Sequence, residues 1–169
     1  MNKLLPLAVL LAVPAAAQDA VYYASDTWPV HSTSGGCTMT QAAHEDRNAL
    51  SVSYDGREVV LATVNEVKTP LPDSGSVAMR LVFLENAGVD YDDGWSSRPF
   101  TYAREDGVFR FSSRFAGEKN TRQLLDDLAN SKHLGFLIKD DVFYDYDLRN
   151  AAPSIARLRE CAARNMAAN

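Results

Sequence analysis

The clearest pattern in the chain is an alternation of apolar and polar residues around the dipeptide Asp55-Gly56. Alternate positions of residues 49–54 are apolar, and residues 57–65 are apolar over most of their length. A period of two is typical of β-strands, and Asp-Gly is favoured in two-residue hairpin turns of type I′, in which both residues have positive φ. The pattern therefore predicts a hairpin of residues 49–54 and 57–65 with a type I′ turn at Asp55-Gly56.

The same alternation predicts antiparallel strands along most of the remaining chain. A short strand is expected at Trp28 and Val30, where Pro29 is tolerated if the strand lies at a sheet edge. A long polar loop, residues 85–97, separates the middle strands from a second hairpin. The further strands expected are 37–40, 77–84, 100–102 with 108–111, and 134–139 with 142–148.

One helix is expected in the second half of the chain. Asn120 has the character of an N-cap residue, and Gln123 stands where the partner in a capping box belongs. Leu124, Leu125 and Leu128 then form an apolar stripe at helical spacing. The pattern predicts a helix of about ten residues that ends near residue 130.

A second helix is expected at the end of the chain, where Pro153 fits the first turn because its missing N–H leaves no helical hydrogen bond unmade. Ile155, Leu158 and Ala162 share one side of this helix, and Cys161 lies at the edge of that side. We therefore expect the helix to lie on the sheet with Cys161 directed toward it.

The amino terminus has the features of a secretory signal peptide. Lys3 supplies a short positive start, an apolar run follows, and residues 15–17 offer an A-x-A cleavage site. The run is shorter than the about 20 apolar residues that a membrane span needs. We predict a signal peptide at 1–17, a flexible mature N-terminus at 18–25 and a single α+β domain at 26–165.

Cys37 and Cys161 are the two cysteines of the chain. Because a lone pair of cysteines in an exported protein usually bonds, we expect a structural disulfide that joins the two ends of the domain. The alternatives are a metal site, which lacks nearby His or Cys ligands at the usual spacing, and a reactive thiol, which lacks a C-x-x-C motif.

These elements together predict the fold class. We expect an α+β protein with a single antiparallel sheet, curved or sandwich-like, of about 7–9 strands. Two short helices accompany the sheet, and the disulfide ties the C-terminal helix to an N-terminal strand.

The charge of the chain restricts its partners. The formal net charge is −5 at pH 7, and no basic cluster stands out along the sequence. Binding to nucleic acid or to anionic membrane surfaces is therefore not expected. A stable membrane anchor after signal cleavage is not expected either, because no cysteine directly follows the cleavage point and no second apolar run occurs. The expected partner is an unknown protein or small ligand in the cell envelope.

Catalytic motifs are weak. The histidines are scattered, and the G-x-S-x-G motif of serine hydrolases is missing. The alternative function that we keep is a hydrolase of envelope polymers through clustered carboxylates. Such a site would gather two or more of these residues in one pocket: Asp92, Asp93, Asp145, Asp147 and His133.

The long loop carries the most suggestive residues. Tyr91 and Trp95 place aromatic bulk among the carboxylates Asp92 and Asp93, and loops with such residues often bind partners. We predict weak ligand-binding roles for these four residues. The competing interpretation is that Trp95 folds back over a small satellite core, and that the carboxylates form a solvated loop or a weak calcium site.

The outline of Trp28, Cys37, the 156–158 stretch and Cys161 resembles small exported proteins of Gram-negative bacteria. It is also distantly similar to the invasion-associated locus B family, whose members are secreted β-rich proteins. The resemblance implies export and a β-rich fold.

The function expected from the sequence is that of an exported, periplasmic or secreted, non-enzymatic binding or envelope-associated protein. An inhibitor of an envelope enzyme is one concrete form, with the 85–97 loop presented by a rigid sheet. We expect no cofactor, no metal and no catalytic residue.

Overall fold

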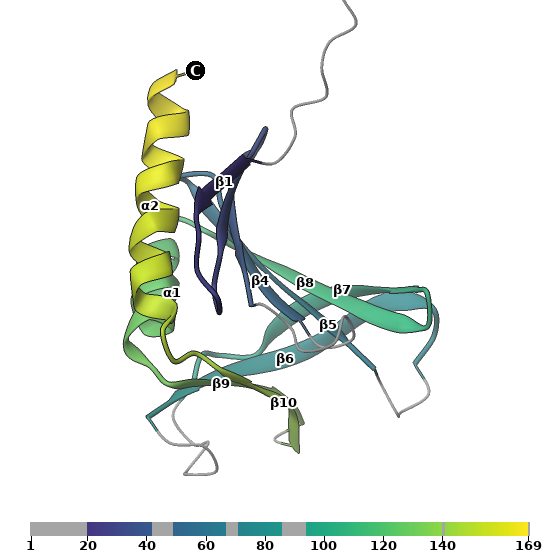
Figure 1. Ribbon diagram of the computed structural model, residues 1–169. Helices are drawn as coiled ribbons and strands as arrows, with labels where there is room; N and C mark the ends of the chain where they lie inside the picture. The colour runs from purple at the N-terminus through teal and green to yellow at the C-terminus, as the bar shows by residue number, and fades with distance from the viewer. Residues whose placement is uncertain (1–19, 42–48, 67–70, 86–93, 140, 169) are drawn as a thin grey trace, which may run out of the picture.

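The structure, a computed structural model, describes residues 20–41, 49–66, 71–85, 94–139 and 141–168. Within these residues, ten strands form one antiparallel sheet and two helices lie together beside it (Figure 1). The expected α+β class and single antiparallel sheet are confirmed, with one strand more than the upper expected number. The residues of the predicted signal peptide lie outside the described part of the chain.

Most elements follow the apolar patterns. The strand expected at Trp28 and Val30 begins only at Val30, after Pro29, and it has a paired strand on each side instead of lying at a sheet edge. The strands are β1 (Ala20–Tyr23), β2 (Val30–Thr33), β3 (Gly36–Thr40), β4 (Ala49–Tyr54), β5 (Glu58–Asn65), β6 (Ser74–Leu84), β7 (Arg98–Glu105), β8 (Val108–Ala116), β9 (His133–Ile138) and β10 (Asp141–Asp147). The helices are α1 (Glu118–Asn130) and α2 (Ala151–Ala168).

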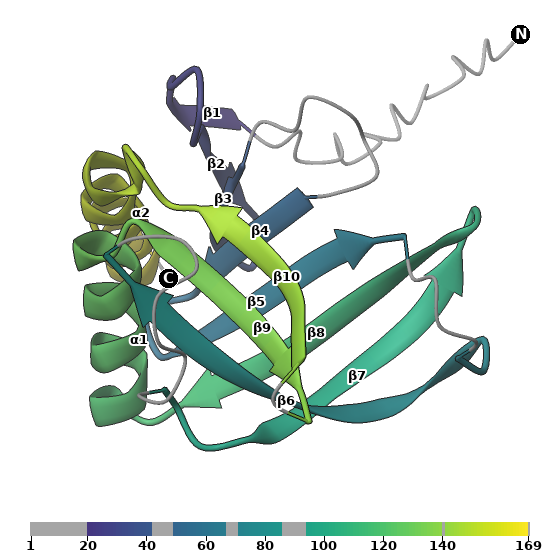
Figure 2. The same ribbon diagram turned by 90° about the horizontal axis from the view of Figure 1, so that it is seen from below.

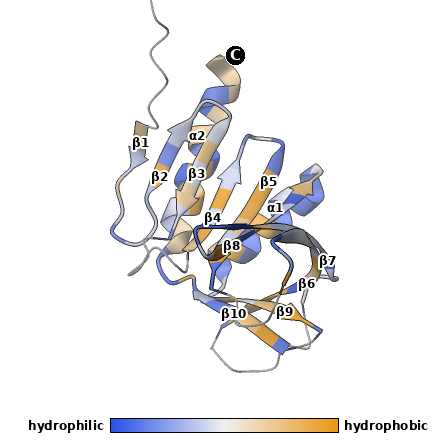
Figure 3. Ribbon diagram, turned by 90° about the vertical axis from the view of Figure 1, so that its right-hand side faces the viewer, coloured by the Kyte–Doolittle hydropathy of each residue, from blue (hydrophilic) through white to orange (hydrophobic). Residues whose placement is uncertain are grey.

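The strand order in the sheet is β1-β2-β3-β4-β5-β8-β7-β6-β9-β10. Strand β6 joins the two parts of the sheet because its first half, residues 74–79, pairs with β7, whereas residues 80–84 pair with β9. Along β5 and β8 alternate residues are buried, so one face of the sheet forms the core. Figure 3 shows apolar stretches on β4, β5 and β9.

The sheet curls until its last strand lies across its middle. In Figure 2, β10 crosses in front of the fan of strands at whose centre β5 and β8 lie. Two contacts fix this arrangement: Tyr146 of β10 hydrogen-bonds to Thr63 and Asn65 of β5, and Gln41 donates to the backbone carbonyl of Asp147 at 3.0 Å. The interior of the curl is a single apolar core.

Both helices cover the same side of this curled sheet (Figures 1 and 2). Helix α2 packs on β3 and on α1, and it buries Ile155, Leu158 and Ala162 as expected. The Cys37–Cys161 disulfide joins β3 to α2, with the two Cα atoms 6.1 Å apart and 124 positions apart in the sequence. The predicted staple between the C-terminal helix and an N-terminal strand is confirmed.

The type I′ turn occurs at a different Asp-Gly dipeptide from the one predicted. In the β4–β5 connection Gly56 has φ 95°, but Asp55 does not have positive φ, so the predicted turn type is wrong. The Asp55 carboxylate instead accepts the backbone N–H groups of Arg57 and Glu58 at 2.7 and 2.8 Å, which favours a wider turn. In the β7–β8 hairpin both Asp106 (φ 50°) and Gly107 (φ 85°) have positive φ.

The start of α1 also differs from the expectation. The helix begins at Glu118, and Gly117 with φ 88° takes the N-cap position without a side-chain cap. Asn120 is therefore inside the first turn, where its amide donates to the Ala116 carbonyl at 3.2 Å. The predicted capping box of Asn120 and Gln123 is wrong, because the helix begins two residues before Asn120, and both side chains are left on its exposed surface.

The segment 18–25, expected to be a flexible N-terminus, contains strand β1. β1 pairs with β2, and the Tyr22 and Tyr23 rings pack against the core. Arg164 and Arg157 of α2 lie over these two rings, with the guanidinium carbons 5.5 and 5.9 Å from the ring centroids. These contacts of Tyr22 and Tyr23 with α2 explain why β1 forms, although the composition of the segment favours a flexible tail.

A polar cluster lies inside the otherwise apolar core. The Tyr146 hydroxyl bonds to the Thr63 hydroxyl and donates to Asn65 Oδ1 at 2.6 Å, and Asn65 Nδ2 donates to Thr63 Oγ1 at 2.8 Å. Thr63 and Asn65 are buried, and burial raises the pKa of Tyr146 to about 12. The cluster therefore holds β10 on β5 with every member hydrogen-bonded.

Replacing Tyr146 with Phe should lower the free energy of unfolding by about 1–3 kcal/mol, because Thr63 and Asn65 lose a buried partner. Tyr144→Phe is the matched control, since its hydroxyl donates to the Glu66 carbonyl outside the core and a smaller loss is expected. Urea denaturation of the three proteins measures both effects. Equal losses in the two variants would contradict a special role for the buried cluster.

Candidate functional site

The structure places one of the four predicted binding residues. Tyr91, Asp92 and Asp93 lie outside the described residues, whereas Trp95 follows the gap and is half-buried. Its backbone N–H donates to the Leu81 carbonyl of β6 at 2.8 Å, which aligns the chain with β6 before β7 begins. Gly94 allows this close approach, because a Cβ there would lie 2.6 Å from the Leu81 carbonyl oxygen.

The Trp95 side chain is held by two contacts on different elements. Its indole Nε1 donates to Asp127 Oδ2 of α1 at 2.8 Å. Its ring meets the buried Phe115 ring of β8 edge-on, with the centroids 5.4 Å apart. Trp95 therefore folds back on the body of the protein, and its orientation is fixed before any ligand arrives.

The neighbouring Arg98 completes this aromatic group. Its guanidinium carbon lies 3.7 Å from the centroid of the Phe115 ring, and its Nη2 donates to the Arg114 carbonyl at 2.8 Å. Partial burial lowers the pKa of Arg98. This cation–π contact helps to fix the Phe115 ring, against which Trp95 packs.

An open recess of about 490 Å³ lies beside Trp95. We call it the Trp95 recess. It is formed by the second half of β6, the chain that leads into β7, and the exposed surface of α1. Its lining residues are Phe83, Gly94, Trp95, Ser96, Asn120, Gln123 and Asp127.

A larger groove of about 780 Å³, the hairpin groove, lies on the other side of α1, against the β4–β5 turn. Its lining includes the apolar surfaces of Tyr54 and Leu125 and several charged side chains. Most of these charges have partners within the protein. Arg159 pairs with Asp126 at 2.6 Å and Glu58 with Arg114, and Arg122 lies 3.7 Å from Glu118.

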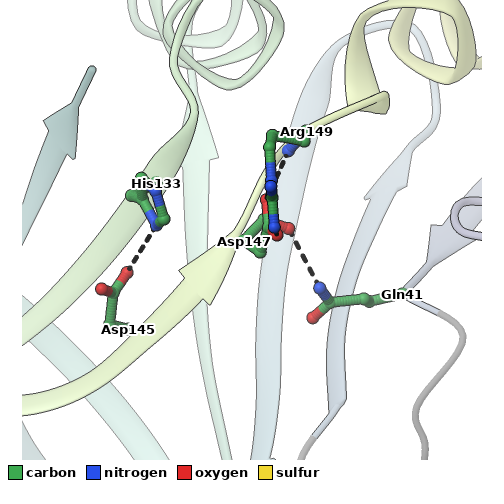
Figure 4. A network of polar contacts seen from close by, with 5 residues as sticks. All are labelled: Gln41, His133, Asp145, Asp147 and Arg149. Atoms are coloured by element: carbon green, nitrogen blue, oxygen red, sulfur yellow. Dashed lines mark hydrogen bonds and ion pairs between the residues drawn. The ribbon is translucent and has the colours of Figure 1, made fainter. Parts of the chain in front are cut away.

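Three of the five residues of the hydrolase alternative come together at the paired ends of β9 and β10 (Figure 4). His133 Nδ1 lies 3.6 Å from Asp145 Oδ1, and Asp147 is bound by the Arg149 guanidinium. Asp92 and Asp93 lie outside the described residues.

The pKa values of the two carboxylates in this group are shifted in opposite directions. Burial raises the pKa of Asp145, although the nearby His133 opposes the shift. The hydrogen bonds from Arg149 lower the pKa of Asp147. A recess of about 580 Å³ includes Asp147 and Arg149 in its lining, but neither His133 nor Asp145. These side chains therefore pair with one another, and none of the recesses described above is lined by both Asp145 and Asp147.

Within the described residues no group of three or more His, Cys, Asp or Glu side chains is placed to hold a metal ion. In the same part of the chain, no helix has both the length and the apolar character required to cross a bilayer. The carboxylates of Asp92 and Asp93, considered above as a weak calcium site, lie outside the described residues.

The sequence pattern does not indicate that Ser96, Asn120, Gln123 and Asp127 belong to a site, although all four line the Trp95 recess. It predicts instead that Asn120 and Gln123 cap the helix. Once α1 begins at Glu118, Asn120, Gln123 and Asp127 are three or four residues apart and share one side of the helix. Only the position of Gly117 in the sequence could have indicated the earlier start.

Comparisons with protein-family models, with curated proteins and with solved structures find no match to this chain.

Replacing Trp95 with Phe keeps the aromatic contact with Phe115 but removes the hydrogen bond to Asp127. We expect a loss of about 1 kcal/mol in the free energy of unfolding, and a similar loss for Asp127→Ala. The double variant should be as stable as the less stable of the two single variants, because both changes remove the same bond. Asp127→Asn keeps an acceptor oxygen and should remain close to wild type. Denaturation curves that give additive losses would show that the two side chains act independently.

Proposed function

We propose that this protein is an exported, non-enzymatic binding protein that holds its ligand in the Trp95 recess. Export is supported by the signal-peptide pattern of residues 1–17 and by the disulfide between the two cysteines of the chain, since such bonds persist mainly in oxidising compartments. Either the periplasm or the extracellular space provides these conditions.

One observation carries the proposal for the site. Trp95 is a large aromatic residue that is fixed in place at the edge of an open recess, where Ser96 and Gln123 have no side-chain hydrogen-bond partner within the described residues. A rigid aromatic surface with unpaired polar groups around it binds a ligand with little loss of conformational entropy.

The hairpin groove is larger but supports the proposal less well. Its rim charges Arg159, Glu58 and Asp55 already bond within the protein. A ligand would have to break these contacts before it could use the charges. The groove therefore serves as the internal comparison for the Trp95 recess.

The hydrolase alternative receives less support. Hydrolysis by two carboxylates requires both groups to face one substrate across a cleft. Here Asp147 is engaged by Arg149, and Asp145 faces His133 on the adjacent strand. Asp145 and Asp147 are therefore not arranged as the two carboxylates of one hydrolytic site.

A site-specific photocrosslinking experiment tests the proposal. A photoreactive amino acid at position 123 faces the Trp95 recess, and the same amino acid at position 122 faces the hairpin groove on the other side of α1. We expect ligand adducts of the full chain from position 123 in living cells, and none from position 122. The protein recovered from the exported fraction should lack residues 1–17.

Adducts from position 122 alone would place binding in the hairpin groove and contradict the proposed site. Equal adducts from both positions would indicate nonspecific contact. Protein retained inside the cell with residues 1–17 intact would contradict export.

A further inference from the structure

The side chains that line the Trp95 recess restrict the chemical class of ligand that it can bind. The described residues of this lining supply an indole ring, the phenyl ring of Phe83, two side-chain amides, one hydroxyl and one carboxylate. None of these described residues is a lysine, arginine or histidine. An anionic ligand such as a phosphate would therefore meet Asp127 and no compensating cation in this lining.

The hydrogen-bonding capacity of this lining is largely unused. The Gln123 amide and the Ser96 hydroxyl make no side-chain hydrogen bond within the part of the chain that the structure describes. Asn120 uses one N–H for the Ala116 carbonyl, which leaves its Oδ1 as an acceptor. Asp127 uses Oδ2 for Trp95, which leaves Oδ1 as a second acceptor.

These groups match a ligand whose polar atoms both donate and accept. Side-chain amides offer donors and acceptors together, a carboxylate offers acceptors, and a hydroxyl offers both. The hydroxyl groups of a sugar have the same dual character. One face of a pyranose ring also presents C–H groups, which pack on the face of an aromatic ring.

We propose that the Trp95 recess binds a neutral oligosaccharide. This inference rests on the proposed function and gives the ligand its chemical class. One sugar ring packs against the Trp95 indole while its hydroxyls bond to Gln123, Asn120 and Asp127. The volume of about 490 Å³ lies in the range of about 300–1,000 Å³ that is typical of small-ligand sites.

The fixed orientation of Trp95 favours this ligand further. Sugars offer few strongly apolar surfaces, so a site that must first order its own side chains would lose much of the available affinity. Here the indole is held by Asp127 and Phe115 before binding. The carboxylate of Asp127 is held by the same bond, so two of the binding groups are positioned together.

Tryptophan fluorescence offers a direct test, because the chain contains two tryptophans and Trp28 is fully buried. The mature protein is titrated separately with cellotetraose, chitotetraose and maltotetraose, which are neutral and differ in linkage and substituents. We expect a saturable change in emission with at least one of them. Because Trp95→Phe removes the reporter, its binding is measured by isothermal titration calorimetry, where we expect weaker binding than in wild type; its folding is checked by circular dichroism.

Substitutions on the exposed surface of α1 complete the test without disturbing the core. The double variant Asn120→Ala/Gln123→Ala should weaken binding by about tenfold or more, because it removes two sets of hydrogen bonds. Arg122→Ala, on the side of α1 that faces the hairpin groove, should bind as wild type does.

Two results would overturn the inference. One is no saturable change with any of the three sugars at millimolar concentration, and the other is equal affinity of wild type and the Asn120/Gln123 variant. If position 123 still crosslinks to a protein or peptide in cells, the ligand class is wrong and the binding site stands. If position 123 gives no adduct and no sugar binds, both proposals fail.

Discussion

The bond between Cys37 and Cys161 is the constraint on which the rest of the structure depends. It fixes the last helix to the third strand across 124 positions of the sequence, with both cysteines buried. Helix α2 in turn holds α1, since Arg159 pairs with Asp126 at 2.6 Å. Asp127, the next residue of α1, holds the Trp95 indole. The Trp95 recess is therefore connected to the disulfide through a continuous series of packed and bonded elements.

The curl of the sheet is the second long-range feature. It is fixed through β10, at the other end of the strand order from β3. Tyr146 reaches from the edge strand β10 to Thr63 and Asn65 in the middle of the sheet. A buried polar cluster of this kind is stable only when each member is bonded, so it favours one position of β10 over neighbouring ones. The disulfide ties β3 to α2 near one end of the strand order, and this cluster ties the edge strand β10 to β5.

The sequence predicts the features that depend on local pattern. The strand at 77–84, the leucine stripe of α1 and the buried side of α2 follow from periodicity, and the disulfide follows from the inferred compartment and the cysteine count. The errors have two causes. Tyr22 and Tyr23 become part of a strand through contacts with the distant helix α2. The turn at Asp55 is decided locally, because its carboxylate accepts the backbone N–H groups of Arg57 and Glu58, a bond that the Asp-Gly dipeptide alone does not reveal.

The candidate site is harder to predict, because three separate segments form it. The place of Trp95 in a polar loop identifies it as a binding candidate. For Asn120 and Gln123 the local pattern favours a capping role, because nothing in it shows that α1 lies beside β6. Their helical spacing with Asp127 indicates a site only when α1 is known to lie beside Trp95.

The most direct test of this account compares the stability of the oxidised mature protein with that of the Cys37→Ala/Cys161→Ala variant by urea denaturation. The account predicts that the variant loses about 2–5 kcal/mol of unfolding free energy, since a long ring is opened and α2 is no longer tied to β3. Coincident denaturation curves would contradict the account, because the position of α2 would then not depend on the disulfide.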